Sequence, residues 1–138
     1  LLNRTYEVGL AEISIREKSG LLAYSPMAFG VLSGKYRNNQ KPQGSRLQLF
    51  GDMFPRYVGK LPSLAVEEYS KISKKYKISL AQLSLAFVNQ QPFVTSNIIG
   101  ATTMNQLKED IGSIDIELSS DIISEINLVH KNNPNPAP

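Results

Sequence analysis

Two glycine-containing loops carry the residues of this sequence best suited to chemistry. The first follows a short apolar segment and reads Tyr24-Ser25-Pro26-Met27-Ala28-Phe29-Gly30-Val31-Leu32-Ser33-Gly34-Lys35. Glycine lets the backbone approach a ligand closely, backbone N–H groups can face an oxyanion, and a terminal lysine adds positive charge. This combination of residue types indicates a site that captures an anion.

The second loop has a similar character. Gly100-Ala101-Thr102-Thr103 follows another apolar segment and leads into a pattern that predicts a helix. The free N–H groups and the dipole of a helix N-terminus favour an anion, and threonine hydroxyls add further donors. Ser25-Pro26 alone also fits an ordinary turn at the end of a strand. Two such loops after successive strands predict a nucleotide site.

The apolar pattern around these loops predicts strands that alternate with helices. Strands are predicted over residues 21–24 and 94–99, and helices over 5–18, 64–77, about 80–90, and from 104 and 120 onward. Ser79, Thr103 and Ser119 are the predicted N-caps of the last three helices. Residues 37–63 predict a long loop anchored by the aromatic residues Phe50, Phe54 and Tyr57. This alternation implies an α/β fold with parallel strands.

The helical period also predicts which side chains face inward. In the first helix these are Val8, Ala11 and Ile15, and in the helix after the second loop they are Leu107 and Ile111. The helix over 64–77 carries an inward stripe of Ala65, Tyr69, Ile72 and Tyr76, and the last helix one of Ile122, Ile123, Ile126 and Val129.

Composition excludes several classes of function. The net charge of +3 is scattered along the 138 residues, without the basic stripe that nucleic-acid binding needs. Cysteine is absent, which removes disulfides and thiolate metal sites and fits a cytoplasmic protein. No apolar run approaches the roughly 18 residues of a membrane span. We therefore expect a globular protein with neither a nucleic-acid partner nor a membrane, and no metal site.

The two loops together resemble those of the aldo-keto reductases. The similarity joins residues 24–35 to the segment from Ile98 to Asp110, covers essentially the whole chain, and is greatest to the Tas-like branch, which is related to potassium channel β-subunits. The resemblance implies that residues 1–138 are the C-terminal half of a (β/α)8 barrel, with about two βα units plus extra helices. Residues 132–138 would form a proline-rich tail.

The resemblance further implies NADP(H) as cofactor and assigns residues to it. The implied cofactor-binding residues are Tyr24, Ser25, Pro26, Met27, Ala28, Phe29, Gly30, Lys35, Arg46, Gly100, Thr102, Gln106, Glu109 and Asp110. The family places an aromatic against the nicotinamide at the position of Tyr24, and the pyrophosphate along Ser25 to Phe29 with a phosphate at Lys35. Arg46 would pack near the adenine ribose, Thr102 and Gln106 would face the 2′-phosphate, and Glu109 would face the adenine.

Some of these assignments have alternatives of equal standing. Arg46 fits an ordinary surface arginine as well as it fits a ligand contact, and the shared helix face of Gln106, Glu109 and Asp110 suits solvent as well as a ligand. The family usually has asparagine in place of Asp110, and many members have lysine and arginine in place of Gly100 and Gln106. Fewer cations near the 2′-phosphate leave the choice between NADP and NAD open.

No catalytic residue is assigned within these residues. In the family a tyrosine, an aspartate, a lysine and a histidine perform the proton chemistry, and all four positions precede Leu1. The predicted function is the cofactor-binding part of an NADP(H)-dependent reductase of small aldehydes and ketones; the alternative is a regulatory subunit resembling the channel β-subunits. Alone, the chain is predicted to be inactive and to self-associate through open strand edges.

Overall fold

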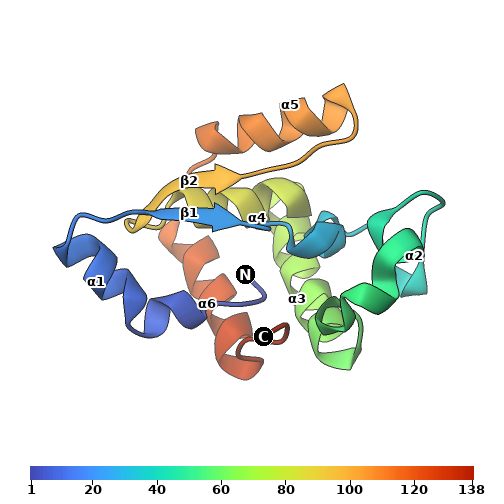
Figure 1. Ribbon diagram of the computed structural model, residues 1–138, viewed down its shortest axis with the longest axis horizontal. Helices are drawn as coiled ribbons and strands as arrows, with labels where there is room; N and C mark the ends of the chain where they lie inside the picture. Colours follow the sequence, from blue (N-terminus) through green and yellow to red (C-terminus); the bar gives the residue numbers. More distant parts are fainter.

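The computed structural model describes all residues from 1 to 138 and has an α/β architecture (Figure 1). Its strands are β1 (Leu21–Tyr24) and β2 (Val94–Ile98), and its helices are α1 (Leu10–Arg16), α2 (Arg46–Phe50), α3 (Lys60–Tyr76), α4 (Leu80–Asn89), α5 (Met104–Gly112) and α6 (Ser120–Asn132). None of these helices has the length and apolar character needed to cross a lipid bilayer.

The two strands pair in parallel, as predicted. Leu21 lies opposite Val94 and Tyr24 lies opposite Ile98, with one irregularity between Leu21 and Leu22. Because the strands run in the same direction, both loops that follow them leave from the same edge of the sheet. The pairing therefore brings together two segments that lie more than sixty residues apart in the sequence.

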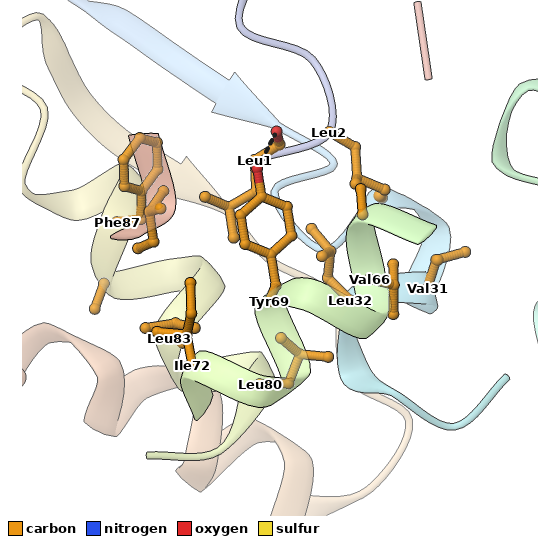
Figure 2. Packing of buried hydrophobic residues seen from close by; sticks show 14 of the residues in the cluster. Leu1, Leu2, Val31, Leu32, Val66, Tyr69, Ile72, Leu80, Leu83 and Phe87 are labelled. Atoms are coloured by element: carbon orange, nitrogen blue, oxygen red, sulfur yellow. Dashed lines mark hydrogen bonds between the residues drawn. The ribbon is translucent and has the colours of Figure 1, made fainter. Parts of the chain in front are cut away.

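The hydrophobic core is formed by helices α3, α4 and α6 together with the first two residues and the loop that follows β1 (Figure 1). The predicted inward stripe of α3 is confirmed, because Ala65, Tyr69 and Ile72 are almost completely buried. Figure 2 shows Tyr69 at the centre of this packing, with its hydroxyl donating a hydrogen bond to the carbonyl oxygen of Leu1. In α6, Ile122 and Ile126 are buried as predicted, and Ile123 and Val129 pack against the core.

The three predicted helix caps are all present. Ser79 Oγ accepts a hydrogen bond from the N–H of Gln82, and equivalent bonds join Thr103 to Gln106 and Ser119 to Ile122. Each cap residue has the extended backbone that an N-cap requires. The starts of α4, α5 and α6 are thus specified locally by sequence.

The predicted helix over residues 5–18 is wrong in part. A 3₁₀ turn over Thr5–Val8 is followed by Gly9, and the α-helix begins only at Leu10. Ala11 is buried as predicted, but Val8 is 85% exposed and Ile15 53% exposed. The period identified an apolar face correctly, yet α1 packs mainly on the 3₁₀ turn before it, so most of that face meets no partner.

Two further expectations need correction. The apolar pattern predicts that Leu107 and Ile111 both point inward from α5. Leu107 is half-buried, but Ile111 is 57% exposed. Residues 37–63 do not form a continuous loop, because they contain α2, short 3₁₀ turns and the start of α3. Phe54 and Tyr57 do anchor this segment against Phe29, while Phe50 is largely exposed.

The proline-rich residues 132–138 fold back onto the start of the chain. The N–H of Ala137 donates to the carbonyl oxygen of Leu2, and the side chain of Asn135 accepts from the N–H of Arg4. Ala137 is buried against the core.

Candidate functional site

The loop after β1 has an unusual backbone. Ser25, Ala28 and Phe29 adopt positive φ angles of 53°, 48° and 60°, and Gly30 follows at 91°. Positive φ is uncommon for residues other than glycine, and each instance costs about 1–3 kcal/mol. The surrounding structure must therefore impose this shape on the loop, and such strain clusters at ligand-binding sites.

Hydrogen bonds within the loop and burial of its last apolar residues in the core hold the loop in this shape. The N–H groups of Ala28 and Gly30 donate to the carbonyl oxygens of Ser25 and Met27, so these two amides are not offered to an anion as the sequence suggested. Beneath them, Val31 and Leu32 are buried in the core beside α3 (Figure 2). What the loop presents is therefore chiefly the side chains that surround this fixed backbone.

Lys35 folds back across Gly30. A β-carbon built on Gly30 would lie 3.3 Å from Lys35 Cε and 3.4 Å from its Nζ. No carboxylate pairs with this lysine, and its Nζ lies 5.2 Å from the centre of the Tyr36 ring. Glycine at position 30 thus allows the positive φ and leaves space for the unpaired Lys35 side chain.

A hollow of about 300 Å³ adjoins the start of this loop. Tyr24, Ser25 and Pro26 line one part of it, and residues 1–7 together with Tyr57 line another. The ring of Tyr24 is 72% exposed, so its face is available for stacking. Leu21, Phe93 and Val94 also line this mainly apolar hollow, so it extends along the strands from their amino ends to the carboxyl end of β1.

The loop after β2 presents the N-terminus of α5. The side-chain carbonyl of Gln106 accepts from both the N–H and the hydroxyl of Thr102, each at 3.0 Å. The N–H groups of Met104 and Asn105, in the first turn, have no intrahelical acceptor. Gln106 therefore shapes the turn rather than providing charge, and the helix end supplies donors for an anion.

Arg46 connects the two loops. Its Cζ lies 5.5 Å from the centre of the Phe29 ring, and its Nη2 would lie 3.6 Å from a β-carbon built on Gly100. No carboxylate pairs with it. From the sequence, Arg46 fits a surface residue and a ligand contact equally well. In the structure it lies between the two loops, at the first turn of α2.

Glu109 and Asp110 occupy different environments on α5. Glu109 Oε1 accepts a hydrogen bond from the hydroxyl of Ser79, the N-cap of α4. Asp110 lines a hollow beside β2 and α4, and partial burial, with a smaller contribution from the negative charge of Glu109, raises the pKa of its carboxyl. Ser79 is a site residue that sequence reasoning recognised only as a cap, because its contact with α5 depends on tertiary packing.

The other chemically active side chains lie away from this edge. His130 is on α6, and burial together with the nearby Arg4 charge lowers its pKa. The hydroxyl of Tyr76 donates to Glu125 and that of Tyr6 pairs with Ser14. No cluster of three or more His, Cys, Asp or Glu residues suited to a metal ion is present.

Comparison with known proteins gives a consistent result. The model of the aldo/keto reductase family matches residues 2–131. The chain is 51% identical over 138 residues to protein Tas of Escherichia coli, covering all of this chain and 40% of Tas, and 38% identical over 115 residues to an aldo-keto reductase of Babesia bovis, covering 80% of this chain and 40% of that protein. A glycerol dehydrogenase structure from Gluconobacter oxydans superposes with a TM-score of 0.75 at 18% identity, covering 96% of this chain and 40% of that one. The chain thus spans about 40% of the length of these relatives.

Proposed function

Because the chain belongs to the aldo/keto reductase family, we propose that it is the cofactor-binding, C-terminal part of a cytoplasmic reductase that converts aldehydes or ketones to alcohols with NADP(H). Its α/β fold is part of a (β/α)8 barrel. The observation that carries the proposal is the meeting of two loops at one edge of the sheet, with Arg46 against both. Barrel enzymes bind their ligands at this carboxyl edge.

The residues at this edge suit a dinucleotide. Lys35 and Arg46 are cations without carboxylate partners, so their positive charge is available to a phosphate. The first turn of α5 adds backbone donors, and the exposed ring of Tyr24 adds a stacking surface at the other end. When bound, the cofactor supplies the hydride for carbonyl reduction. The chain's own residues bind and orient it.

Arg46 also supports NADP(H) over NAD(H). Gly100 and Gln106 carry no charge, so the sequence of the second loop offers no cation to a 2′-phosphate. The guanidinium of Arg46 reaches Gly100 from a different element and places a positive charge there. We propose that this arginine recognises the 2′-phosphate end of the cofactor.

The hollow beside Tyr24 is the proposed entry for a small carbonyl substrate. Its lining is mainly apolar, and the part formed by Tyr24, Ser25 and Pro26 lies at the carboxyl end of β1, which fits a substrate that approaches the nicotinamide. The related glycerol dehydrogenase is, by name, an enzyme of a small polyol, which is the alcohol side of such a reaction.

On its own, the 138-residue chain should show no reductase turnover. Only two strands are present, and the apolar side chains of Leu22, Tyr24 and Ile98 on them are more than half exposed. Unpaired strand edges and exposed apolar residues favour association between copies. We therefore expect dimers or larger species, measured by light scattering, and no oxidation of NADPH; a monomer with turnover would contradict this.

The proposal is tested on the full-length protein by fluorescence titration with NADPH and by turnover on a panel of short aldehydes and ketones. We expect saturable binding and aldehyde-dependent oxidation of NADPH. Binding without turnover would favour the alternative, a cofactor-binding regulatory subunit. A failure to bind either NADPH or NADH would overturn both.

A further inference from the structure

Helix α5 has few buried apolar side chains to hold it against the rest of the molecule. None of its residues is fully buried, and the side chains of Met104 and Ile111 are 65% and 57% exposed. Figure 1 shows it lying along the outer side of the strands, away from α3 and α6. A helix with so little apolar anchoring depends on individual hydrogen bonds for its position. The bond between Ser79 and Glu109 is one of them, and that between Asn89 and Ser113 near its other end is another.

The Ser79 hydroxyl performs two functions at once. It accepts from the N–H of Gln82 at 3.1 Å, which caps α4, and it donates its own hydrogen to Glu109 Oε1. A hydroxyl has one donor and two acceptor positions, so both bonds can form together. The equivalent cap Ser119 accepts from Ile122 and bonds no other side chain. Ser79 therefore links the start of α4 to the middle of α5.

Glu109 differs from the ion-paired glutamates of this chain in the partner of its carboxylate. Glu7, Glu67 and Glu125 are each paired with an arginine or lysine that neutralises them. Glu109 instead bonds a neutral hydroxyl, and its Oε2 has no protein partner. An uncharged donor orients a carboxylate and leaves its negative charge available. One oxygen is thus fixed and the other is free to accept from a ligand.

We propose that Ser79 is a positioning residue for the cofactor, whose hydroxyl fixes the Glu109 carboxylate to receive the amino group of the adenine. This inference rests on the proposed function and on the family resemblance, which implies that Glu109 faces the adenine. The adenine amino group is a hydrogen-bond donor, which matches a free carboxylate oxygen. Ser79 itself touches no reacting atom, so its effect should be on cofactor binding and not on chemistry.

The decisive comparison is between Ser79→Asn and Ser79→Asp in the full-length protein. Serine, asparagine and aspartate are equally good N-caps, so both variants keep the cap of α4. Asparagine retains an N–H donor for Glu109, whereas aspartate places a second carboxylate against it. We expect Ser79→Asn to bind NADPH nearly as tightly as the natural protein. Ser79→Asp should bind about tenfold more weakly, the effect of losing one hydrogen bond to a charged group.

Two further variants separate positioning from stability. Ser119→Ala removes a matched cap far from the site and should leave NADPH affinity unchanged. Ser79→Ala should weaken the binding of NADPH and that of ADP, which has the adenosine and the diphosphate but no nicotinamide, by the same factor of several-fold. Adding Ser79→Ala to Glu109→Ala should produce no further loss, because the hydroxyl acts through that carboxylate.

The outcomes distinguish this inference from the proposed function. Equal NADPH affinity for Ser79→Asn and Ser79→Asp would overturn the role of Ser79 while leaving the proposed function standing. A loss for NADPH without a loss for ADP would also overturn it. If the natural protein bound no dinucleotide at all, the proposed function itself would fail.

Discussion

The loops that follow β1 and β2 begin at the same edge of the sheet but are built in opposite ways. The loop after β1 has a strained backbone, uses its own amides internally and is fastened to the core through Val31 and Leu32. The loop after β2 is short and leads into α5, which has no fully buried residue and is joined to α4 by two side-chain hydrogen bonds. The first loop thus offers the side-chain cation of Lys35 from a fixed backbone, and the second offers backbone donors from a less firmly anchored helix. Variants in each loop should fail in correspondingly different ways.

The largest effect should come from a pair of glycine variants. Gly30→Ala places a side chain at φ 91° and displaces Lys35, whereas Gly100→Ala meets only Arg46 at an ordinary contact distance of 3.6 Å. Left-handed backbone costs a non-glycine residue about 1–2 kcal/mol. We expect Gly30→Ala to lower NADPH affinity by more than about tenfold and to lower the melting temperature. Gly100→Ala should leave both nearly unchanged, and a reversal would contradict the contrast between the loops.

Removing the link between the loops should have the next largest effect. Arg46→Ala takes away the charge that lies between Phe29 and Gly100. We expect the dissociation constant for NADPH to rise about tenfold, as for one charge-assisted hydrogen bond, and that for NADH to rise less. Arg46→Lys should recover part of the difference. An equal loss for both cofactors would argue against a contact with the 2′-phosphate.

A smaller effect is expected at the start of α5. Thr103→Ala removes the cap that accepts from the N–H of Gln106, at a cost of about 1 kcal/mol. Because this helix lacks buried residues, we expect faster amide exchange within α5 and about threefold weaker NADPH binding. Thr103→Ser retains the hydroxyl and serves as the control. Unchanged exchange in α5 would show that the cap does not hold the second loop.

The smallest effect is predicted where the segment after the first loop meets α3. Arg37 forms two hydrogen bonds with the Glu67 carboxylate at 2.8 and 2.6 Å, and these bonds lower the pKa of Glu67. A lowered folded-state pKa stabilises the protein above the unfolded pKa, and this contribution is lost as pH falls through the folded value. Glu67 is 40% exposed, so Glu67→Gln should cost under about 1 kcal/mol at pH 7.

Chemical denaturation at a series of pH values checks this prediction. The stability difference between Glu67→Gln and the natural protein should shrink toward zero between about pH 5 and pH 3. NADPH affinity should not change, because neither residue is among those proposed to bind the cofactor. A difference that stayed constant with pH would rule out the ion pair as its source.

The features that sequence predicted well are those fixed locally. The three serine and threonine caps, the two strands, and the stripe containing Tyr69 depend on residues near one another in the chain, and all are present. The expected burial of Ile15 and Ile111 was wrong because periodicity identifies an apolar face but not whether another element covers it.

In the candidate site, too, the sequence predicted the local features and not the contacts between distant segments. The motifs identified both loops, and parallel pairing placed them at one edge. The sequence did not predict two features of the site. Arg46 lies close to Gly100, and Ser79 donates a hydrogen bond to Glu109. Each joins residues at least 30 positions apart, and only the packing of helices beside the sheet brings them together.

The central claim is that the two loops bind one dinucleotide between them. Amide hydrogen exchange of the full-length protein, with and without NADPH, tests this directly. We predict that the cofactor slows exchange in both segments, residues 26–35 and residues 101–107, and leaves the amides of α6 unaffected. Protection of only one of the two loops, or of neither at saturating NADPH, would contradict it.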